Sequence, residues 1–281
     1  MNRPNALAFD AQGRVFVSDF HNQRIAIFDR EGRRLGDFGE QGLGTGKLWK
    51  VWGVRPAPDN AVYVLNHRIT TAADEEPYVE VKVFGPDHRE RLAFPVTDGF
   101  SSSAGWPSDL ALAADGSVAV VDQQLGAVLW FDPQGHLLRS FRGPDAGQPL
   151  DNPRGIALFA GGFWVVEEYP HRLRKFTADG TQALEIGGEG SEPGRFLFPQ
   201  SIDIAGNGDL LVADLGNYRV QRFSAGGEYL REYRPKRIAG RSPPQLLQAV
   251  FGPDEHVYVA DSKGNRVIVF APDGMWVRDI R

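Results

Sequence analysis

A set of aromatic and polar side chains in Gly- and Pro-rich parts of the chain has the chemistry of a binding site. The aromatic members offer flat apolar faces, and the polar members offer hydrogen bonds and positive charge. The set comprises Trp49, Trp52, Trp106, Phe196 and Tyr218 together with His67, Arg154, Arg195 and Gln200. Taken singly, each aromatic residue is better explained as closing the end of a hydrophobic core. Taken together, the nine residues are the predicted ligand-binding site.

Residues for covalent or metal chemistry are scarce. Cysteine is absent, which excludes a cysteine nucleophile, thiolate metal ligands and disulfides. The serine run 101–103 has the composition of a loop and has no convincing His and Asp partners. His21, His67 and His171 follow comparable apolar runs, so a metal site made from them is a weaker alternative to three exposed loop histidines. No catalytic residue is predicted.

Four acidic residues are each followed by an arginine five positions later. The pairs are Asp19–Arg24, Glu167–Arg172, Asp214–Arg219 and Asp261–Arg266. Because the spacing recurs, it indicates structural ion pairs that join two strands rather than a catalytic site. Ala127 replaces the arginine after Asp122, so we expect that loop to be held in another way.

The same acids reveal the repeat that must position all of these residues. Aligning the residue that ends each apolar run gives Asp19, Asn66, Asp122, Glu167, Asp214 and Asp261, at intervals of 47, 56, 45, 47 and 47 residues. A Phe follows nine residues later in five of the six copies, and Phe84 follows eighteen residues after Asn66, which indicates a nine-residue insertion. Self-similarity with a period of this size is typical of propellers and solenoids.

Each copy contains four strand-like segments and no helical period. In the fifth copy these are residues 201–205, 209–214, 219–223 and 228–233. Four antiparallel strands repeated six times predict an all-β fold, a six-bladed β-propeller, as one domain over residues 1–281. The predicted blades cover roughly residues 1–44, 45–103, 104–149, 150–195, 196–242 and 243–281.

The repeated pattern resembles the NHL repeat. It consists of a Pro, an Ile/Leu-rich strand, a Gly, an apolar run that ends in Asp, a loop with Asn and Arg, and a strand that ends in Phe. LLVADLGNYRVQRFSAGGEY (210–229), VFVSDFHNQRIAIFDREGRR (15–34) and VYVADSKGNRVIVFAPDGMW (257–276) carry it most clearly. The resemblance covers essentially the whole chain and implies the same six-bladed fold. Blade 2 departs from it through the insertion and Asn66, and blade 4 through Glu167 and Glu168.

The resemblance also implies where a channel metal would bind. Amidating lyases among the six-bladed relatives hold zinc on three His, each directly after the opening Pro of a blade. Here Asn5, Ser108, Arg154 and Gln200 occupy that position, with Trp or Leu in blades 2 and 6, so a zinc site of that kind is not expected. Lactonase-like relatives hold calcium on central oxygens, which Asp109, Asp203 and Asn5 could offer, although inner polar residues also simply line a wet channel.

Charge and hydropathy narrow the class of partner. The formal net charge is −5, which gives no general attraction to nucleic acid or anionic membranes, and no apolar run reaches the roughly 18 residues of a membrane span. Five basic residues lie beside two tyrosines in YLREYRPKRIAGR (229–241), as in some RNA-binding NHL domains, but an ordinary solvated loop is the favoured interpretation. The compartment stays open between the cytoplasm and export with a removed signal.

We therefore expect a soluble, monomeric, non-enzymatic propeller without a cofactor that binds a protein, peptide or small ligand on its loop face. The alternative is a metal-dependent hydrolase or lyase that uses the central channel. Two structural expectations accompany this interpretation. The ring should close by packing of blade 6 on blade 1 without strand exchange, and the insertion ITTAADEEPY (69–78) should stand above the loop face.

Overall fold

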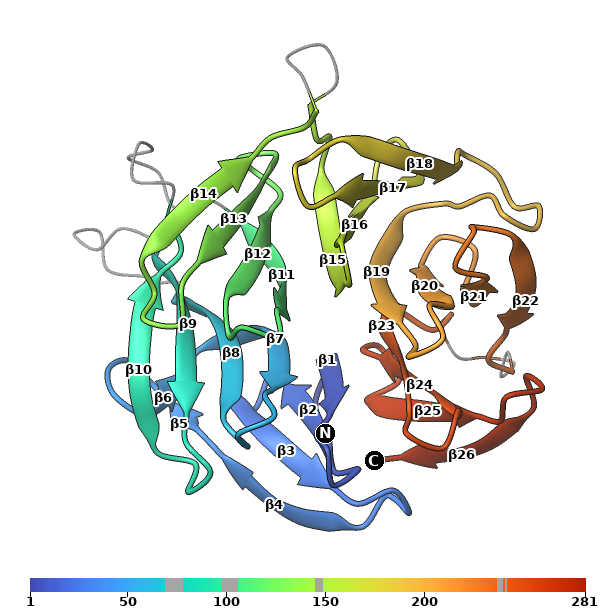
Figure 1. Cartoon of the computed structure of the whole chain (residues 1–281). Helices are drawn as coiled ribbons and strands as arrows, with labels where there is room; N and C mark the ends of the chain where they lie inside the picture. Colours follow the sequence, from blue (N-terminus) through green and yellow to red (C-terminus); the bar gives the residue numbers. More distant parts are fainter. Residues whose placement is uncertain (69–77, 98–105, 145–148, 237–239, 241) are drawn as a thin grey trace.

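Six four-stranded antiparallel sheets surround a central axis in the computed structural model, which confirms the predicted all-β, six-bladed propeller (Figure 1). The structure describes residues 1–68, 78–97, 106–144, 149–236, 240 and 242–281. We number the sheets as blades 1–6 in chain order. Across these described ranges there is no helix, and therefore no helix long and apolar enough to cross a membrane.

The first three blades follow the order of the chain. Blade 1 comprises β1 (Pro4–Phe9), β2 (Val15–Asp19), β3 (Arg24–Phe28) and β4 (Arg34–Phe38). A short parallel pair, β5 (Glu40–Gln41) and β6 (Lys47–Leu48), precedes blade 2. Blade 2 comprises β7 (Lys50–Pro56), β8 (Val62–Arg68), β9 (Tyr78–Phe84) and β10 (Glu90–Pro95). Blade 3 comprises β11 (Pro107–Leu112), β12 (Val118–Asp122), β13 (Ala127–Phe131) and β14 (Leu137–Phe141).

The last three blades repeat the arrangement. Blade 4 comprises β15 (Pro153–Phe159), β16 (Gly162–Glu167), β17 (Arg172–Thr177) and β18 (Gln182–Gly187). Blade 5 comprises β19 (Pro199–Ile204), β20 (Leu210–Asp214), β21 (Arg219–Phe223) and β22 (Tyr229–Tyr233). Blade 6 comprises β23 (Leu246–Phe251), β24 (Val257–Asp261), β25 (Arg266–Phe270) and β26 (Trp276–Ile280). In Figure 1 the first strand of each blade faces the axis and the fourth lies at the rim.

The hydrophobic core lies between neighbouring blades. Six clusters of buried side chains fill the six blade interfaces, because each sheet has an apolar surface on both faces. We call the acidic or amide residue that ends each apolar run of the repeat the anchor. The Phe that follows nine residues after it is buried in every copy that has it, as at Phe28 and Phe223. Second strands such as β20 are buried along their whole length, whereas fourth strands such as β14 are largely exposed. The repeat therefore builds the blade interfaces.

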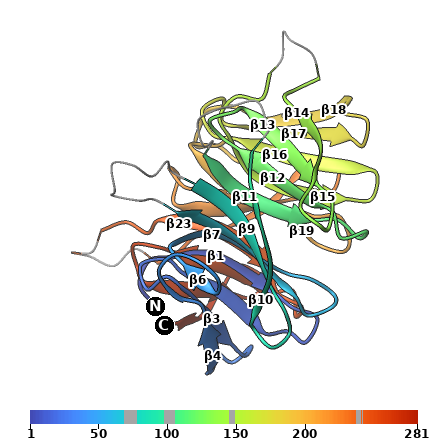
Figure 2. The same cartoon turned by 90° about the vertical axis from the view of Figure 1, so that its left-hand side faces the viewer.

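The ring closes without strand exchange, as predicted. Each four-stranded sheet consists of consecutive strands, so neither terminus enters a sheet at the other end of the chain. Closure instead uses a cluster that joins Leu7 and Val17 of blade 1 to Tyr258 and Val267 of blade 6. Both views place the N- and C-termini side by side (Figures 1 and 2).

The strand register defines two faces of the ring. In blade 1, Pro4 pairs with Asp19 and Asp19 pairs with Arg24, so these three strand ends lie together. The same face carries the connections that lead into each blade, and we call it the loop face. The turns between first and second strands and between third and fourth strands lie on the opposite face.

Candidate binding site on the loop face

One acidic or amide side chain fixes the loop face of every blade. Its first oxygen accepts the backbone N–H of a residue one or two positions before the first strand of that blade. The six bonds run from Asn2 to Asp19, Trp49 to Asn66, Trp106 to Asp122, Asp151 to Glu167, Leu197 to Asp214 and Gln245 to Asp261, at 2.6–3.0 Å. The predicted structural role of these anchors is confirmed, and it includes a bond that the sequence did not reveal.

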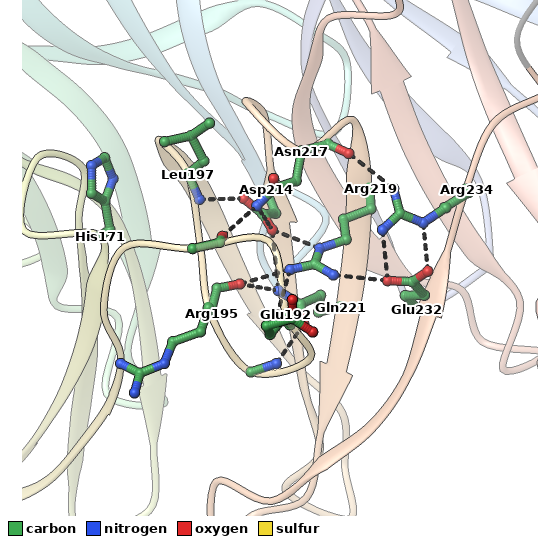
Figure 3. A network of polar contacts seen from close by, with 12 residues as sticks. His171, Glu192, Arg195, Leu197, Asp214, Asn217, Arg219, Gln221, Glu232 and Arg234 are labelled. Atoms are coloured by element: carbon green, nitrogen blue, oxygen red, sulfur yellow. Dashed lines mark hydrogen bonds and ion pairs between the residues drawn. The ribbon is translucent and has the colours of Figure 1, made fainter.

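Blade 5 shows the complete arrangement (Figure 3). Asp214 Oδ2 accepts hydrogen bonds from Asn217 Nδ2 at 2.9 Å and from Arg219 Nε at 2.8 Å. Arg219 then donates from Nη2 to the carbonyls of Glu192 and Arg195, and from Nη1 to the Glu232 carboxylate. Burial raises the pKa of Asp214, and these hydrogen bonds oppose that rise. The ion pair therefore holds the connection from blade 4 against the loop of blade 5.

The other predicted ion pairs also form. The Nε–carboxylate distances are 3.0 Å for Arg24–Asp19, 2.8 Å for Arg172–Glu167 and 2.9 Å for Arg266–Asp261. Blade 2 has a hydrogen bond in place of the ion pair, because the Asn66 amide donates to Glu80, which occupies the position of the arginine. In blade 3, which has Ala127, the loop is held by the Leu125 N–H on Asp122 and by Arg142 on the Leu125 carbonyl.

Two positions of the repeat meet at the mouth of the channel. One is the residue that follows the first-strand partner of the anchor, and the other is the residue directly after the anchor. At the first position lie Asn5, Trp52, Ser108, Arg154, Gln200 and Leu247, and at the second lie Phe20, His67, Gln123, Glu168, Leu215 and Ser262. In blades 1 to 4, the side chains at the second position contact the first position of the same blade or of the next one. The mouth is therefore a staggered ring of two positions.

Arg154 joins three blades within this ring. Its Nη1 donates to Gln123 Oε1 at 2.8 Å, and its Nη2 donates to Gln200 Oε1 at 2.5 Å. Gln200 Nε2 donates to Glu168 Oε1 at 2.8 Å, and Glu168 Oε2 lies 3.5 Å from Arg154 Nε. Glu168 thus balances the charge of Arg154, and the network closes over part of the channel.

An aromatic cluster occupies the adjoining part of the mouth. Trp52 lies with its ring centroid 5.5 Å from that of His67 and 6.0 Å from that of Trp106, and Phe20 contacts Trp52 from blade 1. His67 Nε2 donates to the Pro107 carbonyl at 2.6 Å. Burial lowers the pKa of His67 to about 4, so the ring is neutral at physiological pH. Three predicted site residues from two blades are thus brought together.

Two predicted site residues do not lie at the mouth. Phe196 is fully buried in the core between blades 4 and 5, because its ring packs against Phe223, and its placement at the mouth is wrong. Arg195 is exposed on the connection that follows β18 and donates to the Gly187 carbonyl, and its guanidinium points away from the Asp214 network (Figure 3). Trp49 is half-buried, and its backbone N–H donates to Asn66 Oδ1.

Exposed aromatic side chains stand beside the mouth on blades 3, 4 and 5. Trp106 and Tyr218 belong to the predicted set, whereas Tyr169 and Phe198 do not. Their exposed fractions are 39% for Trp106, 39% for Tyr218, 59% for Tyr169 and 37% for Phe198. Tyr169 and Phe198 form an edge-to-face pair with 6.2 Å between centroids. Tyr169 lies two residues after Glu167 and Phe198 lies directly before Pro199, and these two positions of the repeat were the sequence signal that would have pointed to them.

Two of these aromatic residues occupy backbone positions that favour Gly or Asn. Tyr218 has φ 54°, and the equivalent residues are Gly126 in blade 3 and Asn265 in blade 6, but Gln23 in blade 1 and His171 in blade 4. Phe198 also has φ 54°, and the equivalent residues are Asn152 in blade 4 and Arg3 in blade 1. A bulky side chain costs free energy in the left-handed region, whereas Gly and Asn adopt it more readily. The repeat thus carries exposed aromatic rings where its own geometry favours smaller residues.

The channel below the mouth is narrow. A cavity of about 30 Å³ lies between residues such as Asn5, Trp52, Ser201 and Gln248. Ser201 Oγ accepts the Ala249 N–H, and Gln248 Oε1 accepts the Leu7 N–H, so both side chains link neighbouring first strands. A cavity of this size holds one or two water molecules. A larger molecule bound at the mouth therefore lies across the loop face.

The donor set inside the channel does not match a calcium site. Asp109 is paired with Arg55, whose Nη2 lies 2.9 Å from Asp109 Oδ1, so a guanidinium already supplies positive charge there. Asp203 and Asn5 lie at different levels of the first strands, four and one residues after the strand start. Within the described part of the chain, no three His, Cys, Asp or Glu side chains are grouped to hold a metal ion.

The basic segment before blade 6 is largely engaged elsewhere. Arg231 donates to the Pro272 carbonyl, and Arg234 binds Glu232 and the Asn217 carbonyl. Tyr233 is fully buried, so its ring is not available to stack on a base. Arg237 and Arg241 lie outside the described residues, as does the insertion over residues 69–77.

Comparison with known proteins identifies the repeat. Residues 1–28 and 196–223 match the family model described as NHL repeat. The chain is an NHL-repeat β-propeller. These segments contain the acid–arginine ion pairs of blades 1 and 5, which we call braces, and each also contains the buried Phe.

Relatives of this NHL-repeat propeller are mostly much longer proteins. It is 36% identical to human "E3 ubiquitin-protein ligase TRIM32" over 101 residues, which is 32% of this chain and 15% of that protein. It is 26% identical to Xenopus laevis "Peptidyl-glycine alpha-amidating monooxygenase B" over 243 residues, which is 77% of this chain and 27% of that protein. The propeller thus spans less than a third of the length of either relative.

Solved structures share the fold of the NHL-repeat propeller at low sequence identity. A streptogramin B lyase superimposes with a TM-score of 0.64 at 14% identity, covering 100% of this chain and 83% of that one. A chain of a nidogen/laminin complex gives 0.66 at 16% identity, covering 92% and 90%. Since these identities are low, the comparisons establish the fold and leave function to the site.

Proposed function

We propose that this NHL-repeat propeller is a non-enzymatic binding module that holds a protein or peptide segment across its loop face. The observation that carries the proposal is the placement of Tyr218 and Phe198. Both rings are exposed, and both occupy left-handed backbone positions, at which the other positive-φ blades carry Gly, Asn or the polar residues Arg3, Gln23 and His171. A stability cost retained at an exposed aromatic residue is typical of a functional surface.

The composition and shape of the loop face support a macromolecular ligand. Exposed Trp and Tyr side chains provide most of the binding energy in many protein interfaces. Arg154 and Glu168 give this surface charged groups that are already positioned by Gln123 and Gln200. Because the cavity beneath them is about 30 Å³, an extended segment that crosses the mouth fits better than a small molecule that enters it.

The relatives are consistent with a binding role without defining the ligand. The TRIM32 similarity covers a small part of a ligase, and one solved chain with this fold comes from a nidogen/laminin complex. The alternative predicted from the family, a metal-dependent hydrolase or lyase, lacks support from the side chains at the channel mouth. Arg154, Gln200 and Trp52 occupy the ring position where the amidating lyases carry histidines.

Selection from a random peptide library displayed on phage tests the proposal. We expect wild-type protein to enrich peptides that no longer bind when Tyr218 and Phe198 are both replaced by Asn. The matched control is Trp276→Ala, which removes an exposed ring from the outer strand of blade 6. Peptides that bind wild type and the double variant equally, or that are lost only in the control, would contradict the proposal.

A further inference from the structure

A second cavity opens at the end of the channel away from the loop face. It has a volume of about 590 Å³, within the range of about 300–1,000 Å³ that is usual for small-molecule sites. The ends of four first strands line it, through Phe9 of β1, Arg55 of β7, Asp203 of β19 and Phe251 of β23. This cavity is about twenty times larger than the one beneath the loop face.

The charges that line this cavity do not balance. Arg55 is committed to Asp109, since its Nη2 lies 2.9 Å from Asp109 Oδ1, while its Nη1 donates to the Val54 carbonyl. Arg222 is committed to Asp209, to which its Nε and Nη2 donate at 2.8 and 2.6 Å. Among the described residues, no cation forms an ion pair with Asp203. Its carboxylate is therefore the one acid of the inner cavity wall without a positive partner.

The surroundings of Asp203 make that missing charge costly. Asp203 Oδ2 accepts the Phe251 N–H at 2.8 Å, which stabilises the carboxylate but supplies no full charge. Asp203 is half-buried at the cavity wall, and its partial removal from water raises its pKa to about 6, with Asp109 adding repulsion and Arg55 opposing it. A buried carboxylate gains most from a partner that brings both a hydrogen bond and a positive charge.

We propose that this cavity binds a small organic amine, with its ammonium group on Asp203 and its hydrocarbon part against Phe9, Val250 and Phe251. The aromatic rings provide the apolar contact, and Phe251 already packs beneath a cation, because the guanidinium of Arg222 lies 5.3 Å from its ring centroid. Glu255 lies at the rim of the cavity and adds a second negative charge.

Other classes of ligand fit this cavity less well. An anion would meet Asp203 and Glu255, while the two nearby guanidinium groups are already paired with Asp109 and Asp209. A divalent metal ion needs several oxygen ligands, and on the inner wall Asp203 is the one carboxylate that is not held by an arginine, since Glu255 lies at the exposed rim. An organic ammonium needs one such carboxylate and an apolar wall, and the cavity offers both.

Calorimetric titration with phenethylamine tests the proposal, with phenethyl alcohol and benzoate as neutral and anionic probes. We expect millimolar binding of phenethylamine to wild type, weaker binding of the alcohol and none of benzoate. Asp203→Asn should weaken phenethylamine by about tenfold or more, because a charge-assisted hydrogen bond is lost. Asn can still accept the Phe251 N–H, so the variant should fold.

Two further variants locate the site. Glu255→Gln should weaken phenethylamine by about twofold, with a smaller effect at high salt, because Glu255 is exposed at the rim. Tyr218→Asn on the loop face should leave its affinity unchanged. The proposal is overturned if phenethylamine does not bind wild type at millimolar concentration, binds Asp203→Asn equally well, or binds no better than benzoate. None of these outcomes depends on the function proposed for the loop face.

Discussion

Arg219 and Asp214 form an ion pair inside the protein, with 2.8 Å between Arg219 Nε and Asp214 Oδ2 and both side chains at most 1% exposed. Arg219→Ala would leave a buried carboxylate without its charge partner and would free two carbonyls that the guanidinium now binds. We expect a loss of about 3–5 kcal/mol in the free energy of unfolding.

Chemical denaturation measures this loss, and Arg33→Ala is the matched control. Arg33 pairs with Asp29, but its side chain is 77% exposed, so its removal should cost no more than about 1 kcal/mol. Similar losses for both variants would show that burial does not decide the importance of these pairs.

Gly155 marks the closest approach of two first strands. A Cβ placed on Gly155 would lie 3.0 Å from the Cα of Ser201, which is backbone of blade 5 and cannot rotate away. Gly155→Ala should therefore destabilise the protein by about 1–3 kcal/mol. Gly36→Ala, where a Cβ meets nothing within 4 Å, should be neutral or stabilising, and thermal unfolding of the two variants compares them.

We expect Tyr218 to lower the stability of the fold, because its backbone is in the left-handed region. Tyr218→Asn places a residue suited to φ 54° at that position, so we expect the free energy of unfolding to rise by about 1 kcal/mol. Tyr169→Asn is the control, because Tyr169 is also exposed but is not among the residues with positive φ. If Tyr218→Asn lowers the melting temperature, the backbone argument for the loop face is wrong.

His67 should make stability depend on pH on the acidic side. Its folded-state pKa of about 4 lies below the ordinary value of 6.5, so the unfolded chain binds more protons between these values. Stability should therefore fall as pH decreases from about 6.5 to about 4, by about 3 kcal/mol from this group. His67→Gln keeps a donor for the Pro107 carbonyl and should flatten this part of the curve. An unchanged slope would contradict burial of a neutral His67.

Asp203 should make stability depend on pH with the opposite sign to His67. Because burial raises its folded-state pKa to about 6, the folded chain binds more protons between pH 4 and 6, and stability from this group is lost as pH rises through that range. Arg55 and Asp109 are the charged groups that act on it from neighbouring strands. Asp203→Asn should remove this loss, so the stability difference between variant and wild type should grow from pH 4 to pH 7.

Local pattern was enough to predict the blades. The anchor acids, the arginines five residues later and the Phe nine residues later recur from one blade to the next. The structure contains all four predicted ion pairs. These contacts join strands that are neighbours in sequence, and alternation along a strand determines which side chains enter the blade interface. The absence of strand exchange agrees with this local pattern, because each four-stranded sheet of the described residues is built from consecutive strands.

The composition of the site depended on how the blades pack. Trp52, His67 and Trp106 meet across two blades, and Arg154 contacts Gln123 and Gln200, which lie 31 and 46 residues away. Phe196 and Arg195 are adjacent in sequence, yet one is core and the other is exposed, because connections between blades have no strand period.

The sequence alone thus determined the fold class, the number of blades and the braces, since each rests on contacts within a repeat. Tertiary structure decided which side chains surround the mouth, how little space lies beneath it, and that Asp203 faces a larger cavity at the other end. The physical reason is that a channel is formed by all six first strands together. Its width and charge balance depend on the sum of their side chains, which no single repeat specifies.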